Sequence, residues 1–239
     1  MWDDHKLMNH MANLLFGLAV AGLLYALLMV VLRLPVFPLR GVSVIGGVAQ
    51  TTREQVEAIV REELRGNFFT VDLEVTRLAF EKLPWVRRAA ARRAWPDRLE
   101  VAIEEHVAVA RWRDSALVND RGEVFEAATD ARLPVLIGPP GSAAEMVAQY
   151  GVFADLLGRA GRTPTEVRLS ERRAWELELD NGDVLELGRQ DLVARLTRFA
   201  AVYEHTIARL PQRAHRVDLR YPNGFALRQP GLRWGRRPA

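Results

Sequence analysis

The side chains that could support catalysis or metal binding are few and poorly spaced in this sequence. It has five histidines and no cysteine among 239 residues. Apart from the weak pair His5 and His10, no histidine has a second metal ligand at a suitable spacing. Glu104 and Glu105 are adjacent in an expected strand, so their carboxylates point to opposite faces. His205 lies on an expected helix, where a solvated side chain is a better explanation than a catalytic one.

The motifs that build common active sites are also missing. The sequence has no glycine-rich phosphate loop, no G-x-S-x-G nucleophile elbow and no cysteine nucleophile. Catalytic triads can assemble from distant residues without such a motif, so an enzyme stays open as an alternative. We nevertheless expect no catalytic residue, no metal and no cofactor, and predict a protein whose role is binding.

Chemistry for protein binding is better supplied near the C-terminal end. Residues 217–221 predict a strand, followed by the turn at 222–224 and a second strand at 225–227. An edge strand offers unpaired N–H and C=O groups to a partner. Arg220 and Tyr221 would lie on opposite faces of the first strand, and an arginine with an aromatic residue is a frequent anchor pair at interfaces. The alternative is that Tyr221 belongs to the core and Arg220 is merely solvated.

One apolar run near the N-terminus indicates a membrane span. No charged residue occurs between Met11 and Leu32. The nineteen helical residues from Leu14 onward would rise roughly 28 Å, which matches the hydrocarbon core of a bilayer. A buried core helix would carry a polar stripe, and a cleaved signal peptide would have a shorter run ending in small residues. We therefore expect an uncleaved anchor, whose flanking Lys and Arg weakly favour a cytoplasmic location for the long part.

The charge balance raises nucleic-acid binding as another possibility to weigh. The net charge is +3 and the isoelectric point about 9.7. The 33 basic residues are, however, interleaved with 30 acidic ones along the whole chain. The densest cluster, at 87–93, alternates arginines with alanines in an expected strand, which favours a solvated strand face. Without cysteines, the fold must be stabilised by its apolar core.

The apolar periodicity up to residue 112 predicts the order strand, helix, helix, strand, strand. The first strand is expected at 39–46, and a capping box of Thr51 and Glu54 begins the first helix. The second helix fits 72–82 and is followed by a hairpin with arms at 85–95 and 99–112. The apolar alternation of the second arm is interrupted near Glu105 and His106, which predicts a bulge or bend there.

Residues 113–228 predict a second α+β unit. Ser142 and Glu145 form another capping box before a helix that ends near Gly161. Residues 175–179 and 184–187 flank the turn at 180–183, which is a strong hairpin signal. A long helix follows, with a single apolar stripe from Leu192 to Leu210.

Several short motifs, in this order and spacing, resemble the FtsQ family of bacterial cell division proteins, which is called DivIB in other bacteria. The motifs cover nearly the whole chain: residues 83–86 (LPWV), 93–99 (RAWPDRL), 110–112 (ARW), 119–125 (NDRGEVF), 133–139 (LPVLIGP) and 217–224 (VDLRYPNG). The resemblance implies an α+β chain with an N-terminal transmembrane helix, a POTRA domain of βααββ order, and a mixed α+β domain with an antiparallel sheet. It implies this division: cytoplasmic tail 1–10, transmembrane helix 11–32, linker 33–38, POTRA domain 39–112, β-rich domain 113–228 and disordered tail 229–239.

The resemblance also implies a function. The chain would be a single-pass inner-membrane protein with a cytoplasmic N-terminus and a periplasmic bulk, enriched at the division septum. It would act as a scaffold that binds FtsB and FtsL and helps to control septal peptidoglycan synthesis. In the family a C-terminal strand pairs with FtsB, and a basic position matched by Arg172 contacts an acid of FtsB. The implied partner-binding residues are Arg172, Val217, Leu219, Arg220, Tyr221, Gly224 and Phe225.

Two other functions compete with the scaffold. A POTRA-containing chaperone or translocation component would bind β-strands of client proteins, but outer-membrane assembly proteins of this kind continue into a barrel of alternating strands. A membrane-anchored periplasmic enzyme would act on the cell wall, and a soluble fragment with measurable hydrolysis would favour it. We prefer the scaffold because its motifs are spread along the chain in order.

Overall fold

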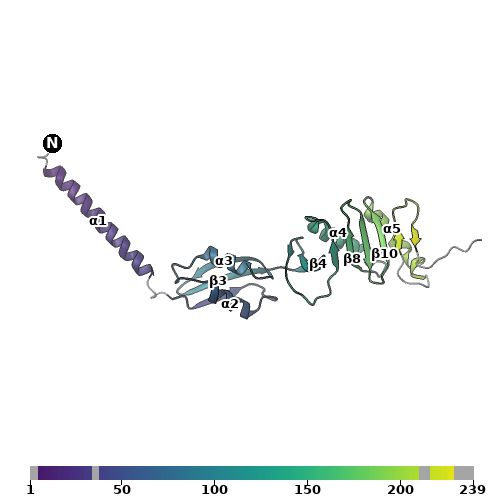
Figure 1. Cartoon of the computed structure of the whole chain (residues 1–239), viewed down its shortest axis with the longest axis horizontal. Coiled ribbons are helices and arrows are strands. Elements are labelled where there is room, and N and C mark those ends of the chain that lie inside the picture. The colour runs from purple at the N-terminus through teal and green to yellow at the C-terminus, as the bar shows by residue number, and fades with distance from the viewer. Residues whose placement is uncertain (1–4, 34–37, 210–215, 229–239) are drawn as a thin grey trace, which may run out of the picture. The chain divides into compact units, whose positions relative to one another are not determined.

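The computed structural model describes residues 5–33, 38–209 and 216–228 (Figure 1). Most of the expected linker at 33–38 and the whole expected tail at 229–239 lie outside these residues. The chain divides into two compact units, Met1–Glu105 and His106–Ala239.

Helix α1, His5–Arg33, is the only described helix long and apolar enough to cross a membrane. Its apolar part, Met8–Leu32, would rise about 37 Å at about 1.5 Å per residue. This exceeds the roughly 30 Å of a hydrocarbon core and would be accommodated by tilting. The helix fits the span that we expected at 11–32 and begins several residues earlier.

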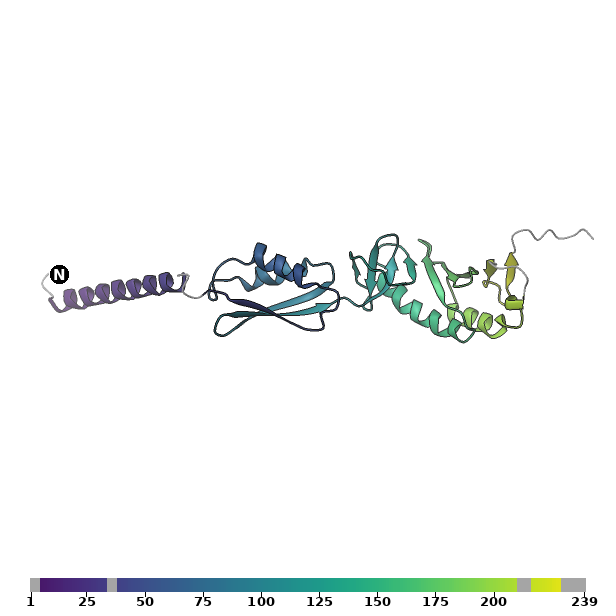
Figure 2. The same ribbon diagram turned by 90° about the horizontal axis from the view of Figure 1, so that it is seen from below.

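The first unit has the strand and helix order predicted from the sequence. Its elements are β1 (Gly41–Ile45), α2 (Arg53–Glu63), α3 (Leu73–Glu81), β2 (Val86–Ala94) and β3 (Arg98–Glu105). The sheet order is β1-β3-β2, with β3 parallel to β1 and antiparallel to β2. Both helices lie on one face of this sheet (Figure 2). In this order β1 is an edge strand of the sheet.

The core of the first unit lies between the sheet and its two helices. Phe80, Leu99 and Val101 have no exposed surface, and burying each such side chain contributes about 1.5–3 kcal/mol. Helix α2 begins with a capping box, but its members are Thr52 and Gln55 and not the predicted pair one residue earlier. Both pairs fit the sequence pattern. In the structure the Thr52 hydroxyl accepts a hydrogen bond from the backbone N–H of Gln55.

The predicted hairpin arm at 99–112 was wrong as a single strand. β3 ends at Glu105, and β4 (Ala108–Trp112) belongs to the sheet of the second unit. The division between the units thus falls after Glu105 and not after residue 112 as expected. The interruption of the apolar alternation at 105–106, where we expect a bulge or bend, marks a change of sheet.

The second unit contains one nine-stranded sheet. Its remaining elements are β5 (Ala116–Asn119), β6 (Val124–Phe125), β7 (Val135–Ile137), α4 (Ala143–Gly158), β8 (Pro164–Leu169), β9 (Trp175–Leu179), β10 (Val184–Gly188), α5 (Leu192–Tyr203), the 3₁₀ helix η1 (Ile207–Arg209), β11 (Arg216–Asp218) and β12 (Ala226–Arg228). The strand order is β12-β11-β10-β9-β8-β7-β4-β5-β6. The predicted α+β class is confirmed. The sheet is mixed and not antiparallel as expected, because the pairs β10–β11, β4–β7 and β7–β8 are parallel.

Helices α4 and α5 cover one face of this sheet (Figure 2). Phe153 from α4 and Phe199 from α5 are fully buried against strand residues such as Leu177. The predicted capping box at Ser142 does not form, since its hydroxyl donates to the Pro139 carbonyl at 2.7 Å. Helix α5 stops at Tyr203, earlier than predicted. Leu196, Phe199, Tyr203 and Ile207 of the predicted stripe are buried, Leu192 is half-buried, and Leu210 lies outside the described residues.

Candidate partner-binding site

The order of the large sheet makes β12 its outer strand at the C-terminal end. β11 pairs on one side with β10 and on the other with β12, so neither of its edges is free. In the described part of the chain, no strand pairs with the outer side of β12. All three of its residues are exposed, including Leu227. A partner strand could therefore add to this sheet beside β12.

The strand that we expected at 217–221 ends at Asp218, so Arg220 and Tyr221 lie in the loop that joins β11 to β12. The Asp218 carboxylate accepts a hydrogen bond from the backbone N–H of Arg220 at 3.0 Å. Such local hydrogen bonds from an aspartate side chain compete with strand pairing. The Leu219 N–H still donates to the Glu186 carbonyl, at 2.9 Å, before the chain turns away.

Arg220 is held in this loop by acidic neighbours. Its Nη2 atom lies 2.6 Å from Asp218 Oδ2 and 3.4 Å from a carboxylate oxygen of Glu186 on β10. The side chain is 57% exposed, so solvent screens these contacts. The hydrogen bonds from Arg220 lower the pKa of Asp218 from its usual value. The pairing fixes the start of the loop and leaves part of the guanidinium open to solvent.

Tyr221 is 54% exposed and does not belong to the core. The loop that carries it is tied to α5, because Arg198 donates a hydrogen bond to the Pro222 carbonyl. Farther along, Gly224 and Phe225 are half-buried, and the Phe225 ring packs edge-on against Phe199 at 6.2 Å between centroids. An exposed aromatic side chain on an anchored loop is well placed to contact a partner.

Two of the expected binding residues, Val217 and Leu219, have their side chains in the core. They are 0% and 2% exposed and belong to the large apolar cluster of the second unit. A partner cannot reach these side chains without unfolding the sheet edge. Their contribution is to hold the loop and β12 in position.

Arg172 lies exposed in the turn between β8 and β9. Ser170 and Ala174 of the same turn line a groove of about 420 Å³ together with Arg220. The structure thus brings Arg220 next to the turn that carries Arg172. Arg216 crosses the strands on this face and pairs with Glu176 and Glu186.

The residues of the exposed edge itself were not among the predicted site residues. Ala226, Leu227 and Arg228 form β12, which overlaps the strand predicted at 225–227. Its position as the outer strand was missed because it depends on β11 pairing in parallel with β10, across the α5 connection. A hairpin motif alone does not show which of its two arms faces solvent.

The described residues contain no group of three or more His, Asp or Glu side chains that could hold a metal ion. The candidate partner-binding site consists of backbone groups of β12, one exposed tyrosine and several arginines. These groups suit protein recognition.

Two family descriptions match the sequence. Residues 37–106 match the FtsQ-type POTRA domain, and residues 110–220 match the C-terminal domain of the cell division protein FtsQ/DivIB. The gap between the two matched ranges, at 107–109, lies just after the division between the two structural units. The second match includes Arg172 and Arg220 and ends just before Tyr221.

Relatives match over almost the whole chain. The cell division protein FtsQ of Nitrosospira multiformis is 46% identical over 233 residues, covering 95% of this chain and 99% of the relative. The FtsQ protein of Burkholderia pseudomallei is 40% identical, with 98% and 96% covered. That of Neisseria gonorrhoeae is 32% identical, with 95% of both chains covered. The chain belongs to the FtsQ/DivIB family of cell division proteins, and its apolar helix α1 fits a membrane anchor.

Proposed function

We propose that this chain is a non-catalytic scaffold of the division septum that binds FtsB and FtsL. Its family membership gives it a role in cell division. The two partners follow from the family resemblance of the sequence. Through them the chain would help to control septal peptidoglycan synthesis.

The exposed outer strand β12 is the observation that carries this proposal. No strand of the described residues pairs with its outer side, so its backbone N–H and C=O groups there could bind a strand of FtsB. Main-chain hydrogen bonds would supply affinity, while nearby side chains would set the register of the added strand. The loop before β12 is anchored at Asp218 and at Pro222, so little ordering would be needed on binding.

Three exposed side chains would contact the partner, two in the loop before β12 and one in the turn between β8 and β9. Tyr221 supplies a large apolar surface with a polar tip, and we propose it as the main anchor. Arg172 and Arg220 supply positive charge, which fits acidic residues of FtsB. Gly224 and Phe225 would act by supporting the loop, since both are half-buried.

We also propose the arrangement of the chain in the cell envelope. Helix α1 would cross the inner membrane, with its N-terminal end in the cytoplasm and both folded units in the periplasm. A scaffold at the septum would thereby connect components on the two sides of the membrane.

A photo-crosslinking amino acid at Leu227 tests this proposal in living cells. We expect a covalent adduct with FtsB, because Leu227 lies on the outer strand. The matched control is Val152, which is similarly exposed but lies on α4. Adducts of equal yield at both positions, or no FtsB adduct at Leu227 in a chain that reaches the septum, would contradict the proposal.

A further inference from the structure

The turn that joins β2 to β3 exposes a tryptophan. Trp95 is 84% exposed, the highest value for a large apolar side chain in the described part of the chain. It belongs to the motif at 93–99, and the proposed binding of FtsB does not use it. Phe69, in the loop between α2 and α3, is 42% exposed. A single exposed apolar side chain is ordinary, so the position of these two aromatic residues decides whether they form a surface.

Arg93 ties the two loops together. Its guanidinium donates hydrogen bonds to the backbone carbonyls of Phe68 and Val71, each at 2.8 Å, and to that of Phe69 at 3.2 Å. Arg93 lies in β2, two residues before Trp95. Three hydrogen bonds from one side chain fix the loop against the end of this strand. Phe69 and Trp95 therefore lie at the same end of the first unit.

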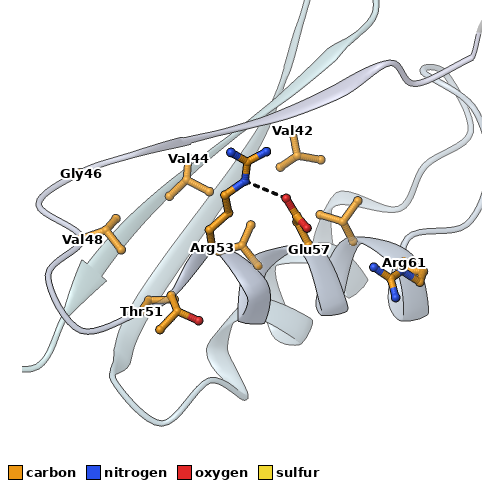
Figure 3. A pocket seen from close by; sticks show the side chains of 11 residues that line it. Val42, Val44, Gly46, Val48, Thr51, Arg53, Glu57 and Arg61 are labelled. Atoms are coloured by element: carbon orange, nitrogen blue, oxygen red, sulfur yellow. Dashed lines mark hydrogen bonds and ion pairs between the residues drawn. The ribbon is translucent and has the colours of Figure 1, made fainter.

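The direction of α2 agrees with this placement. β1 runs from Val42 toward Gly46, and α2 returns beside it from Thr51 to Arg61 (Figure 3). Helix α2 therefore ends toward the start of β1. The loop that follows α2 and carries Phe69 continues to that end of the unit.

The chain arrives from α1 at this same end. Arg40 donates its backbone N–H to the Asp97 carbonyl at 2.9 Å, and its side chain lies 3.6 Å from an Asp97 carboxylate oxygen. The stretch 34–40 between α1 and β1 can span at most about 25 Å, at about 3.3–3.6 Å per residue. If α1 crosses the membrane, as proposed above, the turn at 95–97 is kept near the bilayer surface.

The loops at this end carry an excess of basic side chains. Arg65 and Arg98 are exposed and make no ion pair with another described residue. The acidic side chains of these loops are already engaged, since Asp97 pairs with Arg40 and Asp72 caps α3. Tryptophan is enriched where a membrane meets water, and arginine binds phosphate through charge-assisted hydrogen bonds. The composition of this end therefore fits a surface of anionic phospholipid.

We propose that this end of the first unit binds the bilayer surface. Trp95 inserts at the level of the lipid headgroups, and Arg65 and Arg98 bind lipid phosphates. The contact gives the first unit one preferred orientation on the membrane. The inference rests on the proposed membrane crossing of α1 and does not depend on the proposed binding of FtsB.

The test uses the full chain in lipid nanodiscs without a partner protein. The tryptophans are replaced by 5-fluorotryptophan, and Trp95→Phe identifies the resonance of Trp95. In nanodiscs of anionic lipid, a nitroxide on the acyl chain near the headgroup should broaden this resonance, and a soluble gadolinium chelate should not. The internal reference is Trp85, which lies at the other end of β2, about 30 Å away at about 3.3 Å per residue. Its resonance should not be broadened by the nitroxide.

Charge variants separate lipid binding from simple tethering. Arg65→Gln and Arg98→Gln should each lower the ratio of protected to accessible Trp95 about fivefold, the effect of one basic residue at an anionic surface. Arg88→Gln, which changes an exposed arginine of β2, should leave this ratio unchanged.

Two results would overturn the inference and leave the membrane anchor standing, in a chain that co-elutes with the nanodiscs. One is a Trp95 resonance that the chelate broadens as strongly in anionic as in neutral nanodiscs. The other is equal broadening of Trp85 and Trp95 by the nitroxide. A folded chain that does not co-elute with the nanodiscs would contradict the proposed crossing of α1 and the inference together.

Discussion

Arg220 donates from Nε and Nη2 to the two carboxylate oxygens of Asp218, at 2.8 and 2.6 Å. The pair closes the chain just after β11, where the Asp218 carboxylate also accepts the Arg220 backbone N–H. Tyr221 follows directly and is exposed beside the outer strand β12. This fork-like contact therefore controls where the proposed anchor residue lies.

Replacing Asp218 by asparagine should loosen this loop. We expect a loss of about 1 kcal/mol or less in the free energy of unfolding at neutral pH, because the Arg220 side chain is 57% exposed and solvent screens the pair. The pKa of Asp218 is lowered in the folded chain, so the pair stabilises the fold above about pH 4, the usual aspartate value. This stabilisation is lost as the pH falls through the lower, folded-state pKa. Urea titrations at several pH values would measure the difference.

The control for Asp218→Asn is Asp155→Asn, which removes an exposed carboxylate from α4. At each pH, this variant should have nearly the same free energy of unfolding as the original chain. If the deficit of the Asp218 variant were as large at pH 3 as at pH 7, the ion pair would not be its cause.

Phe199→Ala should affect stability and partner binding together. Phe199 is fully buried, and removing a buried phenylalanine costs about 3–5 kcal/mol. Its ring also contacts Phe225, which directly precedes β12, so the outer strand should lose support. Val193→Ala on the exposed side of the same helix should change the unfolding free energy by less than about 0.5 kcal/mol. Chemical denaturation measures the free energy of unfolding of both variants, and similar losses in the two would contradict this packing.

Glu105→Gln should release the loop that joins β1 to α2, because its carboxylate accepts hydrogen bonds from the backbone of residues 49–51. Burial of the Glu105 carboxyl tends to raise its pKa, but the hydrogen bonds from residues 49–51 outweigh this effect and lower it. The clamp therefore stabilises the loop above about pH 4.3, the usual glutamate value, and this is lost as the pH falls through the lower folded-state pKa. We expect amide exchange at residues 49–51 to speed up about tenfold in the variant at neutral pH.

The matched change for Glu105 is Glu62→Gln on α2, which removes an exposed carboxylate from the same unit. Exchange at residues 49–51 should be the same as in the original chain. Unchanged exchange in the Glu105 variant would show that the carboxylate does not hold the loop.

Two glycine substitutions should have opposite effects on stability. Gly122 adopts φ +78°, and a Cβ there would lie 2.2 Å from the Ala144 Cα atom. Gly122→Ala should therefore destabilise the second unit by about 1–3 kcal/mol. Gly151 lies inside α4 with open space around it, so Gly151→Ala should stabilise the helix by up to about 1 kcal/mol. Thermal unfolding would compare them, and a gain from Gly122→Ala would contradict the close approach.

Local sequence patterns were sufficient to predict most of the helices and strands. The apolar stripe of α5 continues through Tyr203 and Ile207 as expected, although the helix changes to a 3₁₀ turn in between. The hairpin of β9 and β10 also formed around its predicted turn. These elements depend on residues close together in the sequence, and their periodicity is strong.

The errors concern features that depend on pairing between distant segments. The strand β4 joins the second sheet because it pairs with β5 and β7, which the alternation of 99–112 does not reveal. Similarly, Val217 and Leu219 were expected to contact a partner, but the pairing of β11 with β10 places them in the core. Tyr221 is exposed, as contact with a partner requires, and its binding role stays a prediction.

The central claim is that FtsB binds at the outer strand β12 with Tyr221 as the main anchor. The most direct measurement is calorimetric titration of the full chain in nanodiscs with the periplasmic segment of FtsB. We predict saturable one-to-one binding, a loss of more than about 30-fold in affinity for Tyr221→Ala, and no loss for the control Val193→Ala. An affinity that Tyr221→Ala leaves unchanged, in a variant with the original unfolding midpoint, would contradict the account.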